Sequence, residues 1–131
     1  MRSGAAVVFT AGCFNRLHPA HVLMLEAARS YGKRLVVVLA HDSHNCKPNA
    51  VPAKTRLTRL KSLGVADAVL VGRPDSFVRS LRRVKPDVLA LGHDQRLPDQ
   101  DTAREIRKMK IRVVVLPWFP GKEKTLEFAG R

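Results

Sequence analysis

A short segment, RLVVVLA over Arg34–Ala40, most strongly constrains the fold of this chain. A continuous run of apolar residues such as Leu35–Ala40 is typical of a strand buried on both faces of a parallel sheet. Similar runs alternate along the chain with segments that carry apolar residues at helical spacing. The expected strands are Ala5–Ala11, Arg34–Ala40, Ala68–Val71, Asp87–Leu91 and Ile111–Leu116, and the expected helices are Pro19–Tyr31, Ala53–Leu63, Pro74–Val84 and Asp101–Lys110.

This alternation predicts right-handed crossovers, a parallel sheet and helices on both of its faces. The expected fold class is α/β: a single Rossmann-like, doubly wound domain over residues 1–131, with a five-stranded parallel sheet in the order 3-2-1-4-5. A chain of 131 residues, of which 45% are hydrophobic, can bury one substantial core but not two. Residues 117–131, rich in Gly, Lys and Glu, are the part that we expect to be held least tightly.

No apolar run is long enough to span a bilayer, and the first residues do not form a secretory signal sequence. We therefore expect a cytoplasmic protein without a membrane partner. The two cysteines, Cys13 and Cys46, are not spaced as a zinc site or as a CxxC redox motif. Free thiols are the expected state, and a disulfide between the two is the alternative.

The stretch VVFTAGCFNRLHPAH, from Val7 to His21, combines a strand, a glycine turn and the start of a helix. Pro19 suits the first turn of a helix, where its missing N–H costs nothing. His18 and His21 are three residues apart, so they lie on one face of that turn. The helix start also offers free N–H groups and the positive end of the helix dipole. The pattern therefore predicts a phosphate-binding site.

A second loop supports the same location. In a doubly wound sheet, ligands bind at the carboxyl ends of the strands where the winding reverses, here between the first and fourth strands. The loop after the fourth strand, Gly92–Gln95, carries polar side chains suited to binding, as does the histidine stretch. The alternative is that Asp94 and Gln95 only shape a surface loop.

The formal net charge of +13, from 24 Lys and Arg against 11 Asp and Glu, favours anionic partners such as nucleotides and phosphoesters. Aromatic residues make up only 5% of the chain, and they do not alternate with basic residues as in a stacking platform for nucleic acid. A nucleic-acid partner is therefore the less favoured interpretation.

The stretch from Gly12 to His21 resembles the signature of the cytidylyltransferase-like nucleotidyltransferases, G-[TS]-F-D-x-L-H-x-G-H. Five positions match, namely Gly12, Phe14, Leu17, His18 and His21, and three depart, namely Cys13, Asn15 and Ala20. The segment RLTRLKSLGVADAVL, which begins at Arg56, resembles the second-helix segment of the family. LGHDQ is similar to the G-x-D-Q that follows the fourth strand in archaeal FAD synthases of this superfamily.

This resemblance implies that a phosphate oxygen of an acceptor attacks the α-phosphorus of a nucleoside triphosphate and that pyrophosphate leaves. The implied catalytic residues are His18, His21, Lys47 and Arg56. The implied nucleotide-binding residues are Ala11, Gly12, Cys13, Phe14, Asn15, His18, His21, Gly92, His93, Asp94, Gln95, Lys122, Lys124 and Thr125. Mg²⁺ is expected to bind through the substrate phosphates, without protein ligands.

The last motif of the family is missing from this chain. After the fifth strand, relatives carry R-T-x-G-I-S-[ST]-[TS], which grips the β- and γ-phosphates. Here the chain reads PWFPGKEKT from Pro117, where Lys122, Lys124 and Thr125 offer charge and one hydroxyl. We expect Trp118 and Phe119 to pack under the tail rather than to cover the base.

The resemblance, together with the GHDQ loop, implies an enzyme that transfers AMP from ATP to FMN and so makes FAD. The competing transferase is a cytidylyltransferase that uses CTP with glycerol 3-phosphate or another small phosphate ester. A third alternative, of another class, is a protein that binds a nucleotide or RNA without catalysis, since Asn15 and Ala20 depart from the signature. Relatives are often dimers, so the resemblance leaves a homodimer open.

Overall fold

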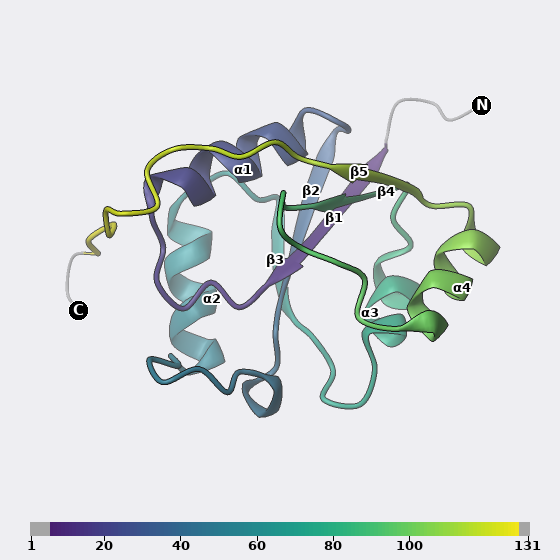
Figure 1. The fold of residues 1–131 in the computed structure, drawn as a ribbon, viewed down its shortest axis with the longest axis horizontal. Coiled ribbons are helices and arrows are strands. Elements are labelled where there is room, and N and C mark those ends of the chain that lie inside the picture. Colours follow the sequence, from purple (N-terminus) through teal and green to yellow (C-terminus); the bar gives the residue numbers. More distant parts are fainter. Residues whose placement is uncertain (1–5, 129–131) are drawn as a thin grey trace.

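The computed structural model of this protein describes residues 6–128 of the chain. Its centre is one sheet of parallel strands in the order β3-β2-β1-β4-β5 (Figure 1). The strands are β1 (Val7–Gly12), β2 (Arg34–Leu39), β3 (Ala68–Val71), β4 (Val88–Leu91) and β5 (Arg112–Val115). The expected fold class and strand order are therefore confirmed.

The helices cover both faces of this sheet. They are α1 (Pro19–Arg29), α2 (Ala53–Ser62), α3 (Phe77–Val84) and α4 (Gln100–Met109), with a short 3₁₀ turn, η1 (Asp42–His44), after β2. One apolar cluster joins the sheet to α1 and α2 through Leu25 and Leu60. A second cluster joins the opposite face to α3 and α4 through Leu81 and Ile106. Because β2 lies between the two clusters, its five apolar residues are all buried.

The strands β1 and β4 diverge at the point where the winding reverses. They pair at Val8 with Val88 and at Phe9 with Leu89. One residue further along, the fully buried Thr10 hydroxyl donates a hydrogen bond of 2.8 Å to the carbonyl oxygen of Ala90. This side chain ties the two strands together directly below the loops that follow them.

One boundary in the structure differs from the expected one in an informative way. The helix α3 begins at Phe77 rather than at Pro74, after Ser76 in an extended conformation. Residues 74–76 instead form part of a loop. In it the carbonyl of Pro74 contacts the ring of His44, and the carboxylate of Asp75 forms an ion pair with Arg79. The expected first residue of β1, Ala5, lies outside the described residues.

The segment after β5 runs back over the sheet towards α1 (Figure 1). Phe119, Leu126 and Phe128 pack against the cluster that contains α1 and α2. The backbone N–H of Leu126 donates a hydrogen bond of 2.9 Å to the carbonyl of Leu17. The segment that the sequence marks as least tightly held is thus docked as far as residue 128.

Within residues 6–128, none of the helices has the length and apolar character needed to cross a membrane.

Replacing Thr10 by valine should lower the free energy of unfolding by about 1–3 kcal/mol, because a buried carbonyl then loses its hydroxyl donor. Chemical denaturation monitored by circular dichroism measures this loss. Thr10→Ser keeps the hydroxyl and serves as the matched control. A valine variant as stable as the parent protein would contradict a role for this hydrogen bond.

Candidate active site

An open cavity of about 470 Å³ lies at the carboxyl ends of the strands, where the sequence predicts a phosphate site. Its wall is formed by the loop after β1, the start of α1, the loops after β2 and β4, and the segment after β5. The lining residues are Gly12, Cys13, Phe14, Asn15, Arg16, His18, Ala20, His21, Met24, Lys47, Asn49, Gly92, His93, Asp94, Gln95, Pro117, Trp118, Phe119 and Lys122.

The two histidines at the start of α1 cap the helix reciprocally. The backbone N–H of His21 donates to Nδ1 of His18, and the backbone N–H of His18 donates to Nδ1 of His21, each at 3.3 Å. Their rings stack 3.6 Å apart between centroids. Because each Nδ1 accepts a hydrogen bond, each neutral ring carries its proton on Nε2. The cap therefore leaves two Nε2–H donors for a ligand.

The surroundings keep both rings neutral. Burial lowers the pKa of His21 to about 4, with a further contribution from the neighbouring His18. Burial also lowers the pKa of His18, and the charges of Arg16 and Lys122 act in the same direction. A neutral imidazole is a hydrogen-bond donor at Nε2 without a charge of its own. The positive potential here thus comes from the arginine, the lysine and the helix dipole.

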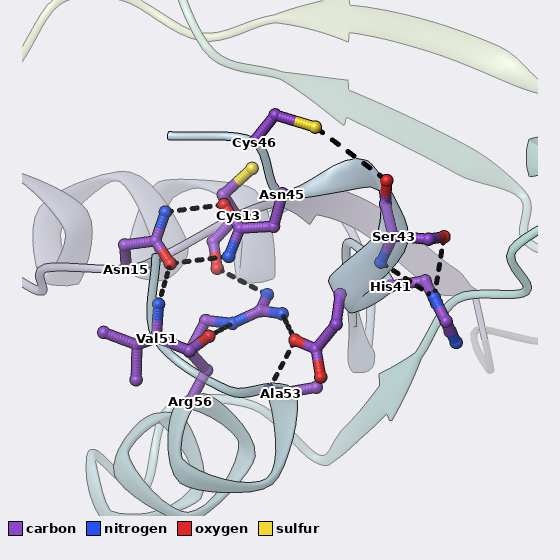
Figure 2. A network of polar contacts seen from close by, with 10 residues as sticks. Cys13, Asn15, His41, Ser43, Asn45, Cys46, Val51, Ala53 and Arg56 are labelled. Atoms are coloured by element: carbon purple, nitrogen blue, oxygen red, sulfur yellow. Dashed lines mark hydrogen bonds and ion pairs between the residues drawn. The ribbon is translucent and has the colours of Figure 1, made fainter. Parts of the chain in front are cut away.

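A pair of asparagines joins the loop after β1 to the loop after β2 (Figure 2). Asn15 Nδ2 donates to Asn45 Oδ1 at 2.8 Å, and Asn45 Nδ2 donates to Asn15 Oδ1 at 2.7 Å. The N–H of Val51 donates to the same Asn15 oxygen at 2.9 Å. Both asparagines are buried. Residues 46–50, which include Lys47, are therefore held at both ends of a short loop.

Arg56 completes this network from α2 (Figure 2). Its guanidinium donates to the carbonyls of Val51 and Cys13 and to the carboxylate of Asp42. The Arg56 side chain is fully buried, whereas that of Asp42 is 57% exposed. The guanidinium holds the pKa of Asp42 below its usual range. Arg56 does not line the cavity, and its contacts fix the two loops that do.

Gln95 connects the loop after β4 to the end of β1. Its Oε1 accepts a hydrogen bond of 2.6 Å from the N–H of Gly92, and its Nε2 donates to the carbonyl of Ala11 at 2.9 Å. These bonds close the loop into a tight turn and leave the side chains of His93 and Asp94 about half or more exposed at the rim. This loop can therefore offer the ligand backbone groups and two polar side chains.

The segment after β5 forms the remaining wall of the cavity. Phe119 packs against the core, as expected, but Trp118 does not: it is 64% exposed and lines the cavity. The expectation that Trp118 packs under the tail is wrong, because consecutive side chains of the extended segment point in opposite directions and only one of them can face the core.

Most residues that the sequence singles out are brought together by the fold. Those outside the cavity wall are Ala11, Arg56, Lys124 and Thr125. Lining residues that the sequence analysis missed are Arg16, Ala20, Met24, Asn49, Pro117, Trp118 and Phe119. Of these, Arg16 and Ala20 lie inside the recognised signature, Arg16 at one of its two variable positions. Asn45 was also missed, and its polar loop carried no signal that it pairs with Asn15.

A family model described as cytidylyltransferase-like matches residues 9–128 of the chain. The chain belongs to the cytidylyltransferase-like family. It is 36% identical over 127 residues to the FAD synthase of Methanohalophilus mahii, covering 95% of this chain and 89% of that one. It is 33% identical over 124 residues to the FAD synthase of Pyrococcus horikoshii, covering 89% and 84% respectively. The crystal structure of the lipopolysaccharide core biosynthesis protein from Thermoplasma volcanium superposes with a TM-score of 0.78 at 29% identity, covering 88% of this chain and 98% of that one.

Membership of this family confirms that the chain is a nucleotidyltransferase. The chemistry of the cavity agrees with that activity. Nucleotidyl transfer between phosphates depends on positioning and on stabilising charge on phosphate oxygens, which hydrogen-bond donors and cations provide. Two Nε2–H groups, the N-terminus of α1, Lys47 and Lys122 supply these around one cavity.

Asp94 contributes a carboxylate to the wall of the cavity. Within residues 6–128, no group of three or more His, Cys, Asp or Glu side chains is arranged to hold a metal ion. A carboxylate oxygen at the position of Asp94 is a donor that fits a hard cation. Cys13 and Cys46 are both free thiols in the structure.

The lowered pKa values of His18 and His21 predict that the nucleotidyltransferase loses stability as the pH falls from about 6.5 towards 4. Over this range the unfolded histidines bind protons that the folded ones exclude, so the free energy of unfolding decreases as the pH decreases. Urea titrations at pH 7, 6, 5 and 4.5 measure the slope. The His18→Gln, His21→Gln double variant should flatten it, with His93→Gln as control, and an unchanged slope would contradict the assignment.

Replacing Asn15 by aspartate should lower the free energy of unfolding at pH 7 by about 1–3 kcal/mol. The carboxylate still accepts from Val51 and Asn45, but its second oxygen faces Asn45 Oδ1 without a proton between them. The matched control is Asn49→Asp, which makes the same change in the neighbouring loop, after β2. Similar stabilities of the two variants would show that the amide pair contributes nothing.

Proposed function

We propose that this nucleotidyltransferase is an FMN adenylyltransferase, which transfers AMP from ATP to FMN in the cytoplasm and releases pyrophosphate. The observation that carries the proposal is the reciprocal cap of His18 and His21, which presents two neutral Nε2–H donors at a helix start. The choice of ATP and FMN is supported by relatives named FAD synthase that match most of this chain, and by the GHDQ loop after β4.

The reaction requires no covalent intermediate with the protein. A phosphate oxygen of FMN attacks the α-phosphorus of ATP and forms the new P–O bond. The bond from that phosphorus to the oxygen bridging the α- and β-phosphates breaks, and this oxygen leaves with pyrophosphate. Because the attacking oxygen is already anionic, the site has to align the two phosphates and stabilise the charge that shifts to the leaving oxygen.

His18 and His21 would donate from Nε2 to the α-phosphate and the bridging oxygen. The N–H groups at the start of α1 would add to the same charge stabilisation. Lys47, held in its short loop by the asparagine pair, would balance the negative charge where the two phosphates meet. Arg56 would contribute by holding the loops rather than by contacting phosphate.

The nucleotide base and ribose would lie along Gly12–Asn15 and Gly92–Gln95, with Trp118 at the rim. Mg²⁺ bound by the phosphates would neutralise part of the triphosphate charge, with water and substrate oxygens as its ligands. Lys122 would approach the triphosphate from the segment after β5, where the Ser/Thr motif of the family is missing.

The proposal predicts release of pyrophosphate and formation of FAD when the protein is given ATP, FMN and Mg²⁺. Replacing either His18 or His21 by alanine should lower kcat by about 10²–10³-fold, as for the loss of one preorganised donor. Chromatography of the flavin products together with a pyrophosphate assay measures both. His44→Gln, an exposed histidine outside the cavity, is the matched control.

The same assay distinguishes the alternatives. Turnover with CTP and glycerol 3-phosphate, but not with ATP and FMN, would replace the adenylyltransferase by a cytidylyltransferase. Binding of ATP without turnover of any acceptor would overturn catalysis and leave a nucleotide-binding protein.

A further inference from the structure

We propose that Arg16 is a positioning residue that holds the segment 117–128 against the start of α1, so that Lys122 faces the phosphates of the bound nucleotide. This inference rests on the proposed function for the identity of the nucleotide. It assigns a role to a residue at one of the two variable positions of the signature, and it accounts for phosphate binding in a chain without the final Ser/Thr motif.

The guanidinium of Arg16 binds three acceptors within four consecutive residues of that segment. One terminal nitrogen donates to the carbonyl of Lys122 at 2.9 Å. The other donates to the carbonyl of Lys124 at 3.1 Å and to the hydroxyl of Thr125 at 3.0 Å. A planar fork with several N–H groups can reach such a set of acceptors at once, whereas the single ammonium group of lysine cannot match that geometry.

The backbone of the segment also lies directly on the first turn of α1. Gly121 has a φ of +107°, and a Cβ placed there would lie 2.8 Å from Cβ of Pro19 and 3.1 Å from the backbone nitrogen of Ala20. A side chain at position 121 is therefore excluded both by the backbone conformation and by this contact. Together with the bond from Leu126 to Leu17, the close approach fixes the segment on each side of the Arg16 contacts.

These contacts determine where Lys122 stands. Its side chain lines the cavity, and its charge contributes to the lowered pKa of both His18 and His21. Because the guanidinium of Arg16 binds the Lys122 carbonyl directly, losing this guanidinium frees Lys122 to move its charge away from the cavity. Arg16 also lines the cavity, so direct binding of phosphate by its own charge is the competing explanation, and the variants below separate the two.

Arg16→Lys keeps the charge but removes the fork, and Lys122→Met removes the charge but leaves the fork. We expect each variant to raise the KM for ATP by about tenfold, the loss of one charge-assisted contact, with little change in the KM for FMN. The double variant should be no worse than either single variant, because both changes remove the same contact. Arg104→Lys, on the exposed face of α4, is the matched control.

A second measurement needs no substrate. Arg16 binds the carbonyls of Lys122 and Lys124. Trypsin cuts the peptide bonds that these two carbonyls form, on the carboxyl side of each lysine. Arg16→Lys should be cleaved at both sites several-fold faster than the parent protein, with the products identified by mass spectrometry. Gly121→Ala should show the same faster cleavage although Arg16 is intact, because its side chain pushes the segment from α1.

An unchanged KM for ATP in Arg16→Lys would overturn the proposal and favour direct binding of phosphate by the charge of Arg16. Additive effects on this KM in the double variant would do the same. Unchanged trypsin cleavage in both Arg16→Lys and Gly121→Ala would overturn the docking itself. If the parent protein does not turn over ATP and FMN, the proposed function fails. The cleavage experiment and calorimetric binding of ATP then still decide the role of Arg16.

Discussion

The backbone N–H of each of two histidines donates to the ring of the other, and the chemistry of the site depends on this exchange. A helix start leaves N–H groups without partners inside the helix, and a serine or aspartate usually satisfies one of them. Here His18 and His21 do so with Nδ1. The same bonds that begin α1 thus select the tautomer, stack the rings and direct both remaining protons away from the helix. Capping uses one side of each imidazole, and in the proposed function ligand recognition uses the other.

The rest of the site is built by polar groups that lie inside the protein. A fully buried guanidinium is costly unless its donors are satisfied, and Arg56 meets this condition with two carbonyls and one carboxylate. The amide pair of Asn15 and Asn45 is similarly self-contained. Both connect loops that follow different strands. The polar loop between β2 and α2 is consequently held by hydrogen bonds at several residues. Lys47 lines the cavity from this loop.

Hydrophobic patterning predicted the sheet, its helices and the edge at which the site lies. It did so because a strand buried on both faces needs consecutive apolar residues, as in Arg34–Leu39. It was less accurate where a tertiary contact decides, as at the start of α3, where Pro74 contacts a histidine from another loop. Long-range polar partners were beyond its reach. No pattern near Arg16 indicates that its hydrogen-bond acceptors lie more than a hundred residues away. Likewise, no pattern near Asn45 indicates that it pairs with Asn15. The exposure of Trp118 likewise depends on which way one extended segment turns.

The hydrogen bond from the N–H of Leu126 to the carbonyl of Leu17 joins residues that lie more than a hundred positions apart in the chain. A growing chain on the ribosome produces the histidine turn early, and it must extend past residue 126 before the wall that faces this turn exists. Local helices form within microseconds, whereas contacts of such long sequence separation form late. Until residues 117–126 have been made and have packed, the start of α1 lacks the wall that faces it, so the complete cavity forms only after this contact of long sequence separation.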